Sequence, residues 1–382
     1  MKFHRGAKQE PDKSIFSKQL LPKKSFSGFT PNLFIGSHGY PFINVGALSS
    51  ENKHSIDNPK EFLSAQVKDV VENRQSFVNS RLIMKAQHVQ GRFIEQLQDI
   101  AKSTKQLDSE VDLAKPIPSM LSLSQRAMPH GPSATLKKLS LTTNAKVKRK
   151  VESLTSDTDV KAADAIAELG QAKVDEHQLT KLLSAGTLGQ KRKLVPTKWS
   201  ITAVDDMRGK QLLEDIHSFE DVHPHYRQAE IMGNTFYLLF LPGAWSFELL
   251  EITFPETIYN NSDSFLFSHD YEYPQGRKRY VKETAGAYYA ARLGVVEYLH
   301  TLGKQGRVIC LRAITAAYTA PLGVWIIREG VRKALLAKEH EVKSSKESIK
   351  TFCASQGIDG YSVLGELQLL REQQSRLASF LH

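Results

Sequence analysis

The spacing of hydrophobic and polar residues changes several times along the chain, and each spacing predicts a type of element. Residues 27–48 alternate apolar clusters with glycines and a proline, which is typical of strands joined by turns. Longer apolar runs predict three further strands, over residues 234–241, 245–254 and 307–315, the first two joined by a Pro-Gly turn. We also expect a strand over the segment WSITAVDD, residues 199–206, with its apolar side chains toward a core.

Other segments carry apolar residues at the three- and four-residue spacing of an amphipathic helix. Pro59 opens one such segment, and Asn58 is its candidate cap. Further helices are predicted at about 88–107, 159–174, 281–303 and 328–342, and in parts of 346–355 and 362–373. The stretch from 108 to 157 is poor in periodicity and contains PIPS and MPHGPS, so we predict a loop-rich segment with a basic face. Strands and helices mix without a regular βαβ rhythm, which favours a mixed globular α+β fold.

The composition fits a globular protein with anionic partners. The 382 residues suffice for two domains, and 41% apolar with 24% charged residues is the balance of a soluble protein. The net charge of +10 favours nucleic acid as a partner, although a basic protein without such a partner is the plainer alternative. The longest apolar run, residues 236–245, is too short to cross a membrane, and the N-terminal residues do not resemble a signal peptide.

The two cysteines predict neither a Cys₄ zinc site nor a redox motif. No CxxC is present, and Cys310 lies in an apolar run typical of a core thiol, while Cys353 stands alone. We therefore predict no metal site and no bound cofactor, and we expect a reducing, cytoplasmic location.

Basic clusters supply the candidate contacts to nucleic acid. Lysine and arginine neutralise phosphates, and neighbouring tyrosines can stack on bases. In the segment GRKRYVK the cations lie beside Tyr273 and Tyr280, although a solvated turn explains this run equally well. The candidate nucleic-acid-binding residues are Lys191, Arg192, Lys193, Lys198, Arg277, Lys278 and Arg279.

Carboxylates offer an alternative, enzymatic function. No P-loop, HExxH or GxSxG motif is present, so whether the protein is an enzyme stays open. A Mg²⁺-dependent nuclease needs converging carboxylates, and the candidates are Asp206, Glu248, Glu251 and Asp270. Glu248 and Glu251 differ by an odd step and would face opposite sides of a regular strand. We favour the simpler explanation that these acids pair with cations such as Arg208 or Arg277, and that Arg292 pairs with a buried carboxylate such as Glu329.

The C-terminal segment QSRLASFL has the pattern of an anchor peptide. Positions three apart eclipse one another in a 3₁₀ turn, so Leu377 and Phe380 would form one apolar plug that Leu381 widens. Gln374 supplies an amide that fixes the register. The segment resembles the peptide that binds the sliding clamp, the proliferating cell nuclear antigen. An ordinary amphipathic last helix is the alternative.

Several segments together resemble the archaeal DNA repair protein Nre family. These are FIGSHGYPFINVG (34–46), KLVPTKWSITAVDD (193–206), GRKRYVKETAGAYYAARLGVVEYL (276–299) and PLGVWIIREGVRKAL (321–335). The resemblance implies a DNA-damage repair factor that binds DNA and joins the sliding clamp. Some members carry an N-terminal cysteine cluster, which this sequence lacks.

The charge of the N-terminal residues and the resemblance together predict a division of the chain into segments. We expect a basic flexible tail at 1–26, an N-terminal domain at 27–265, a C-terminal domain at 266–372 and a clamp-interacting tail at 373–382.

Overall fold

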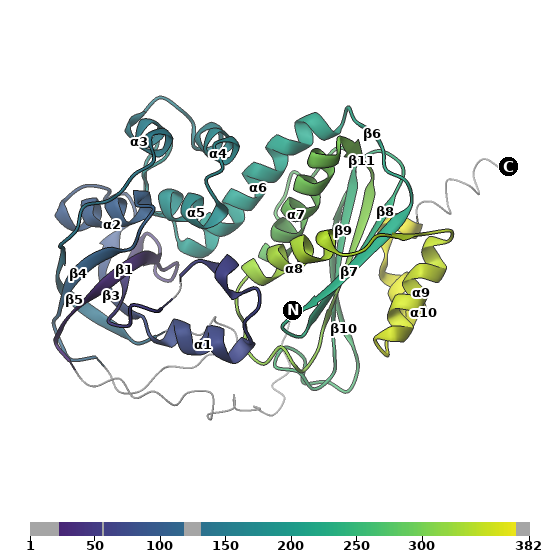
Figure 1. Ribbon diagram of the computed structural model, residues 1–382, viewed down its shortest axis with the longest axis horizontal. Helices are drawn as coiled ribbons and strands as arrows, with labels where there is room; N and C mark the ends of the chain where they lie inside the picture. The colour runs from purple at the N-terminus through teal and green to yellow at the C-terminus, as the bar shows by residue number, and fades with distance from the viewer. Residues whose placement is uncertain (1–22, 56, 118–130, 372–382) are drawn as a thin grey trace. The chain divides into compact units, whose positions relative to one another are not determined.

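The chain forms two compact units that divide between Arg208 and Gly209. The computed structural model describes residues 23–55, 57–117 and 131–371 (Figure 1). We call residues 23–208 the N-terminal unit and residues 209–371 the C-terminal unit. Both units combine helices with strands, so the predicted α+β class is confirmed.

The N-terminal unit is built on a closed barrel in the order β1-β2-β3-β5-β4. Its strands are β1 (Ser25–Ile35), β2 (Phe42–Ser50), β3 (Val78–Lys85), β4 (Leu107–Leu113) and β5 (Ser133–Leu141). Strands β3 and β5 run parallel, and the other neighbours are antiparallel. Helix α2 (Arg92–Lys102) follows β3 in the chain. Five strands in this order, with the helix between the third and fourth, have the topology of an OB fold.

Inward-facing apolar side chains fill this barrel with one core. In β2 the side chains of Ile43, Val45 and Ala47 are fully buried, whereas Phe42 is exposed and Asn44 is half-buried. Helix α2 adds Ile94 and Leu97 to the same core, because apolar residues three apart lie on one helical face. The strands predicted within 27–48 are thus confirmed as β1 and β2.

Short helices complete the N-terminal unit. They are η2 (Pro59–Phe62), α1 (Val67–Gln75), α3 (Arg149–Ser156), α4 (Ala162–Gln171), α5 (Glu176–Ser184) and the first part of α6 (Thr197–Ile216). Asn58 caps η2 as predicted, since its side chain accepts a hydrogen bond from the Lys60 amide at 3.1 Å.

Two expectations for this unit are wrong. The segment 199–206 is helical, not extended, and lies in α6, where Val204 is fully buried. Its β-branched residues favour a strand, but packing on the core of the unit overrides that preference. The stretch 108–157 is only partly loop, because it contains β4, β5 and α3; residues 118–130 lie outside the described part.

The C-terminal unit is built on a sheet in the order β10-β9-β12-β8-β7-β13. These strands are β7 (His225–Ile231), β8 (Asn234–Leu241), β9 (Ser246–Thr253), β10 (Leu266–Glu272), β12 (Arg307–Ile314) and β13 (His340–Glu341). Strands β6 (Glu220–Asp221) and β11 (Lys304–Gln305) form a separate pair. Strand β12 lies between β8 and β9, so the predicted Pro-Gly turn joins two strands that are not neighbours.

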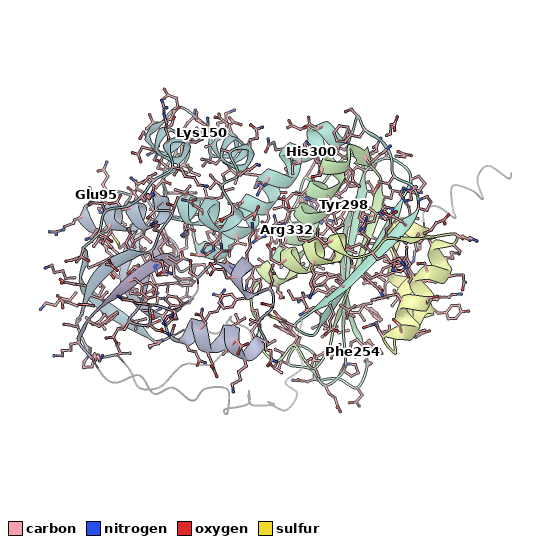
Figure 2. All side chains as sticks on the ribbon, in the orientation of Figure 1. Glu95, Lys150, Phe254, Tyr298, His300 and Arg332 are labelled. Atoms are coloured by element: carbon pink, nitrogen blue, oxygen red, sulfur yellow. The ribbon has the colours of Figure 1, made fainter. Side chains whose placement is uncertain are left out.

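Helices cover both faces of this sheet (Figure 1). They are α7 (Gly286–Leu302), α8 (Trp325–Leu336), α9 (Ser345–Ser355) and α10 (Gly360–Glu366). Helices α7 and α8 are joined by an ion pair between Arg332 and Glu297, with an Nη2–Oε2 distance of 2.7 Å. Arg332 is labelled in Figure 2. Helix α8 approaches β8 so closely that a Cβ at Gly330 would lie 2.1 Å from the Phe236 ring. Both cysteines are buried thiols, as expected for Cys310.

Candidate nucleic-acid interface

The outer face of β2 and β3 exposes apolar side chains that the barrel does not use. Phe42 is 60% exposed and Ile83 is 72% exposed. The register pairs Phe42 with Lys85 and Asn44 with Ile83, so these four residues occupy adjacent outward positions on two neighbouring strands. Large apolar groups gathered on a surface mark a binding site more often than scattered ones do.

Cations flank this apolar surface. Arg81 and Lys85 occupy outward positions of β3 on either side of Ile83. Gly46 lies opposite Arg81 and has no room for a side chain, because a Cβ there would lie 2.4 Å from Asn79 Oδ1. The surface therefore combines exposed apolar side chains with positive charge.

A second aromatic pair lies at the loop that enters β2. The rings of Tyr40 and Trp199 have centroids 5.3 Å apart, and the two side chains are 41% and 44% exposed. The Ile35 amide donates a hydrogen bond to Thr197 Oγ1 at 2.9 Å, which holds the start of α6 beside the end of β1. The folded unit thus joins the segments 34–46 and 193–206, which are far apart in the sequence.

We define the barrel face as Tyr40, Phe42, Arg81, Ile83, Lys85 and Trp199. The opposite charge marks another side of the barrel, where β4 turns Asp108, Glu110 and Asp112 outward. The three carboxylates make this side less suited to a phosphate ligand than the barrel face, although Asp112 lies opposite Lys138 of β5. The face between strands two and three is also where OB folds bind oligonucleotides, with bases stacked on aromatic side chains.

The predicted nucleic-acid-binding residues of the N-terminal unit differ in accessibility. Lys191, Lys193 and Lys198 are exposed, and Lys198 is adjacent to Trp199 in the chain. Arg192 instead donates hydrogen bonds to the carbonyl oxygens of Asp157, at 2.7 Å, and Gly189, at 3.3 Å. The three lysines are available for phosphate contacts, whereas Arg192 holds two loops together.

The remaining predicted cations lie in the C-terminal unit. Lys278 and Arg279 are exposed. Arg277 donates to the Tyr271 carbonyl oxygen, lies 3.4 Å from Asp270 Oδ1 and is stacked over the Tyr288 ring. Because its guanidinium is already engaged on three sides, we assign Arg277 a structural role.

Comparison with known proteins places the chain in one family along nearly its whole length. The family described as "Archaeal Nre, N-terminal" matches residues 8–260, and "Archaeal Nre, C-terminal" matches residues 272–380. The chain belongs to the archaeal Nre family. The first family match ends at residue 260 and the second begins at residue 272, whereas the boundary between the compact units follows Arg208. The domain division between residues 265 and 266 stays a prediction.

Relatives within the Nre family are named for DNA repair. The "DNA repair protein NreA" of Haloferax volcanii is 33% identical over 352 residues, covering 88% of this chain and 84% of that protein. The "DNA repair protein NreB" of Archaeoglobus fulgidus is 33% identical, covering 84% of this chain and 82% of its own length. The "DNA repair protein NreA" of the same organism is 31% identical, covering 97% and 93%. No solved structure matches this Nre chain.

The four candidate catalytic carboxylates of this Nre chain lie in different places and have different partners. Asp206 lies in α6 of the N-terminal unit. Glu248 is fully buried and accepts hydrogen bonds from the Gln368 and Leu369 amides, at 2.8 and 2.9 Å. Burial raises the pKa of the Glu248 carboxyl. Glu251 points to the opposite face of β9, as predicted, and pairs with Arg312.

Asp270 accepts four hydrogen bonds from one loop. The amides of Lys282, Glu283 and Thr284 donate to its carboxylate at 2.9–3.0 Å, and so does the Thr284 hydroxyl. Burial acts to raise the pKa of Asp270, but these hydrogen bonds hold it below the usual value. Its predicted pairing with Arg277 is confirmed.

These acids do not converge. Within the described residues, none of the four acids belongs to a group of three or more side chains close enough to hold a metal ion. Their catalytic role stays a prediction that no contact supports. Arg292 pairs with a buried carboxylate, as expected, but the partner is Glu272, at 3.0 Å, and not Glu329. Glu329 instead binds Arg332, one turn further along α8.

Some predicted residues lie outside the described part of the chain, and the barrel face is not predicted from the sequence. Gln374, Leu377, Phe380 and Leu381 lie outside the described residues, as does most of the predicted tail at 1–26. The sequence does not predict the barrel face, because Phe42 and Ile83 resemble ordinary core residues until the register is known. Only the alternation of β2 and β3 carries that signal. None of the described helices is long and apolar enough to span a membrane.

Proposed function

We propose that this Nre-family protein is a DNA-repair factor that binds single-stranded DNA on the barrel face. The observation that carries the proposal is the adjacent exposure of Phe42 and Ile83 between Arg81 and Lys85 on an OB-type barrel. The repair role comes from the names of the relatives, which cover most of the chain. The net charge of +10 supports a polyanionic ligand.

The physical basis is stacking in a positive field. Every base offers a flat face, so exposed aromatic and aliphatic side chains bind single strands with little dependence on sequence. In duplex DNA these faces are stacked on one another and are not available. The proposed ligand is therefore a single strand or a gapped duplex.

The test is fluorescence anisotropy with a labelled oligothymidine and with a duplex of the same length. Replacing both Phe42 and Ile83 by Ala should weaken single-strand binding by roughly 5- to 150-fold, the equivalent of about 1–3 kcal/mol. The matched control replaces Leu336 and Tyr361 by Ala, two side chains of the C-terminal unit that are 88% and 73% exposed. Equal affinities of the two double variants would refute the barrel face as the site.

We further propose that the segment 374–381 tethers the protein to the sliding clamp, the proliferating cell nuclear antigen. The support is the sequence pattern alone, in which Leu377 and Phe380 form the apolar plug and Gln374 the polar end. A tether raises the local concentration of the protein on DNA, so a modest peptide affinity suffices.

This second proposal is tested by gel filtration with the purified clamp. Replacing Leu377 and Phe380 by Ala should abolish co-migration, because both halves of the plug are removed. Replacing Ser375 and Ser379 by Ala alters the same segment at positions outside the plug and should preserve co-migration. Retained binding by the Leu377/Phe380 variant would refute the assignment.

A further inference from the structure

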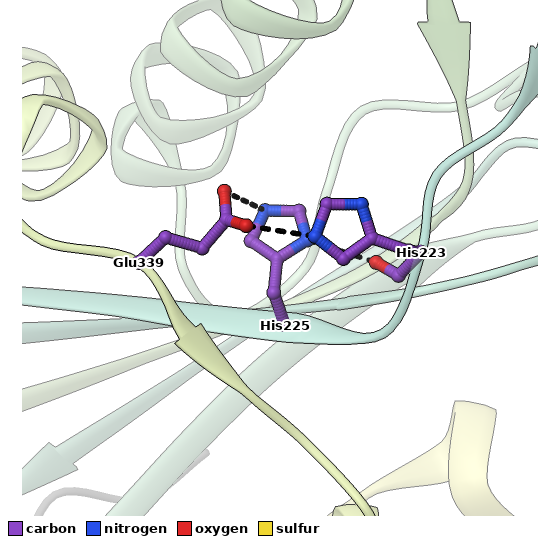
Figure 3. A group of neighbouring side chains, drawn as sticks. All are labelled: His223, His225 and Glu339. Carbon is purple, nitrogen blue, oxygen red and sulfur yellow. Dashed lines mark hydrogen bonds and ion pairs between the residues drawn. The ribbon is translucent and has the colours of Figure 1, made fainter.

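Two histidines and a glutamate of the C-terminal unit meet where β7 begins (Figure 3). His225 is the first residue of β7, and His223 precedes it by two positions. Glu339 immediately precedes β13, whose His340 pairs with Tyr226 of β7. The pairing of β13 with β7 therefore brings Glu339 beside both imidazoles.

The side-chain geometry approaches that of a metal-ligand set. The three ligand atoms all lie within 4.8 Å of one another. His223 Nε2 is 2.7 Å from Glu339 Oε1, and His225 Nε2 is 3.7 Å from Glu339 Oε2. Ligands about 2.0–2.1 Å from a tetrahedral zinc ion are about 3.3–3.4 Å apart, a value between those two distances.

The strongest evidence is the unpartnered nitrogen of His225. Its side chain is 1% exposed, and its Nδ1 donates a hydrogen bond to the His223 carbonyl oxygen at 2.8 Å. In the neutral imidazole this bond leaves the lone pair on Nε2, an atom that is buried and has no hydrogen-bond partner. Stacking on Phe240, with centroids 4.5 Å apart, fixes the ring. A backbone carbonyl that orients the distal nitrogen is the usual outer-shell arrangement of a metal-binding histidine.

The carboxylate is oriented as well. Arg227 Nη2 donates to Glu339 Oε2 at 2.9 Å, and its Nη1 donates to the carbonyl oxygens of Leu335 and Ala337. This arginine anchors the carboxylate to the chain segment that follows α8.

We propose that His223, His225 and Glu339 bind one divalent transition-metal ion of the zinc class. Two imidazoles and one carboxylate suit zinc, whereas magnesium prefers oxygen ligands alone. The His223 and Glu339 side chains are 66% and 34% exposed, so a fourth position faces solvent. The ion would fasten the segment before β13 to the start of β7. No such site is predicted from the sequence, because Glu339 lies 116 residues beyond His223.

The test is zinc binding by the full chain after removal of metal with a chelator. Calorimetric titration with zinc chloride should give one ion per chain, and cobalt(II) should give the visible absorption of a tetrahedral site. Glu339→Gln and His223→Ala should each weaken zinc binding by at least about tenfold. Zinc should also raise the unfolding temperature of the wild-type protein more than that of either variant, because an ion that binds the folded state stabilises it.

The matched control is His217→Ala, which removes an exposed histidine of the same unit and should leave zinc binding unchanged. Both test residues are partly exposed, so the variants should fold, and circular dichroism checks this. The proposal is overturned if the wild-type protein takes up no zinc, or if the two variants bind zinc as tightly as His217→Ala does.

Discussion

The barrel face and the interior of the C-terminal unit both contain cations beside aromatic rings, but the first exposes them and the second buries them. On the barrel face, Arg81 and Lys85 point outward beside exposed Phe42 and Ile83. In the C-terminal unit, Arg292 and Arg312 are 2% and 5% exposed, and each pairs with a carboxylate. Both regions hold cations next to aromatic rings, but only the first presents them to solvent.

This contrast separates a binding surface from a structural network. A buried arginine must be paired, because an isolated charge in the interior is strongly unfavourable. The Arg292–Glu272 pair is extended by Trp245, whose Nε1 donates to Glu272 Oε1 at 2.9 Å. Because these groups are buried and paired with one another, they are not accessible to a ligand. The cations and rings of the barrel face are at least partly exposed, which is why we propose that they bind DNA.

The largest expected effect comes from breaking the buried network. Glu272→Ala leaves the Arg292 guanidinium without its carboxylate, and it should lower the free energy of unfolding by about 3–5 kcal/mol. Urea denaturation followed by tryptophan fluorescence measures the change. The control Arg279→Ala removes an exposed cation of the same unit and should change the free energy by less than about 0.5 kcal/mol. A loss below about 1 kcal/mol in Glu272→Ala would contradict the structural role.

The next effect compares two tryptophans, one from each region. Trp199 is 44% exposed and Trp245 is fully buried. Trp199→Ala should weaken single-strand binding by about 1–3 kcal/mol with little loss of stability, because a stacking platform is removed. Trp245→Ala should instead destabilise the fold by about 3–5 kcal/mol. Anisotropy measures the DNA affinity of both variants, and urea denaturation measures their stability. Unchanged DNA affinity in Trp199→Ala would restrict the interface to β2 and β3.

Sequence patterns predict the long elements of this fold well, because each has one clear period. Strands β8 and β12 and helix α7 lie in long apolar segments and are found where expected. Helix α6 is missed because Ile201, Thr202 and Val204 favour a strand when tertiary packing is unknown. The barrel also escapes prediction, since its closure depends on pairing β3 with β5 and β1 with β4, which are distant in sequence.

The candidate site is predictable only in part. Runs of cations are visible in any sequence, so Lys191, Lys193 and Lys198 are predicted directly. Phe42 and Ile83 are not, because an outward apolar residue differs from an inward one only by the register of its strand. The proposed clamp peptide is the reverse case, since a short linear pattern can be recognised without knowledge of the fold.

A smaller effect asks which cations meet phosphate. Replacing Arg81 and Lys85 by Gln should reduce the slope of log affinity against log salt by about 1.4, or about 0.7 for each lost contact with a single strand. Replacing Lys278 and Arg279 by Gln should leave the slope unchanged if the barrel face alone binds DNA. Anisotropy titrations over a range of potassium chloride concentrations measure both slopes. An equal reduction in the second variant would extend the interface to the C-terminal unit.

The smallest expected effect is the pH dependence of the Asp270 loop. The folded-state pKa of Asp270 is lowered below the usual value, because the hydrogen bonds from Lys282, Glu283 and Thr284 outweigh burial. A lowered carboxyl pKa stabilises the fold above the pKa of the unfolded chain, and this contribution is lost as the pH falls through the folded-state pKa. Asp270→Asn should therefore cost about 1 kcal/mol at neutral pH, and its difference from the wild-type protein should shrink in acid. Urea denaturation across this pH range measures the difference, with exposed Asp263→Asn as the control. A difference that stays constant from neutral pH into acid would mean that the loop depends on the shape of the side chain and not on its charge.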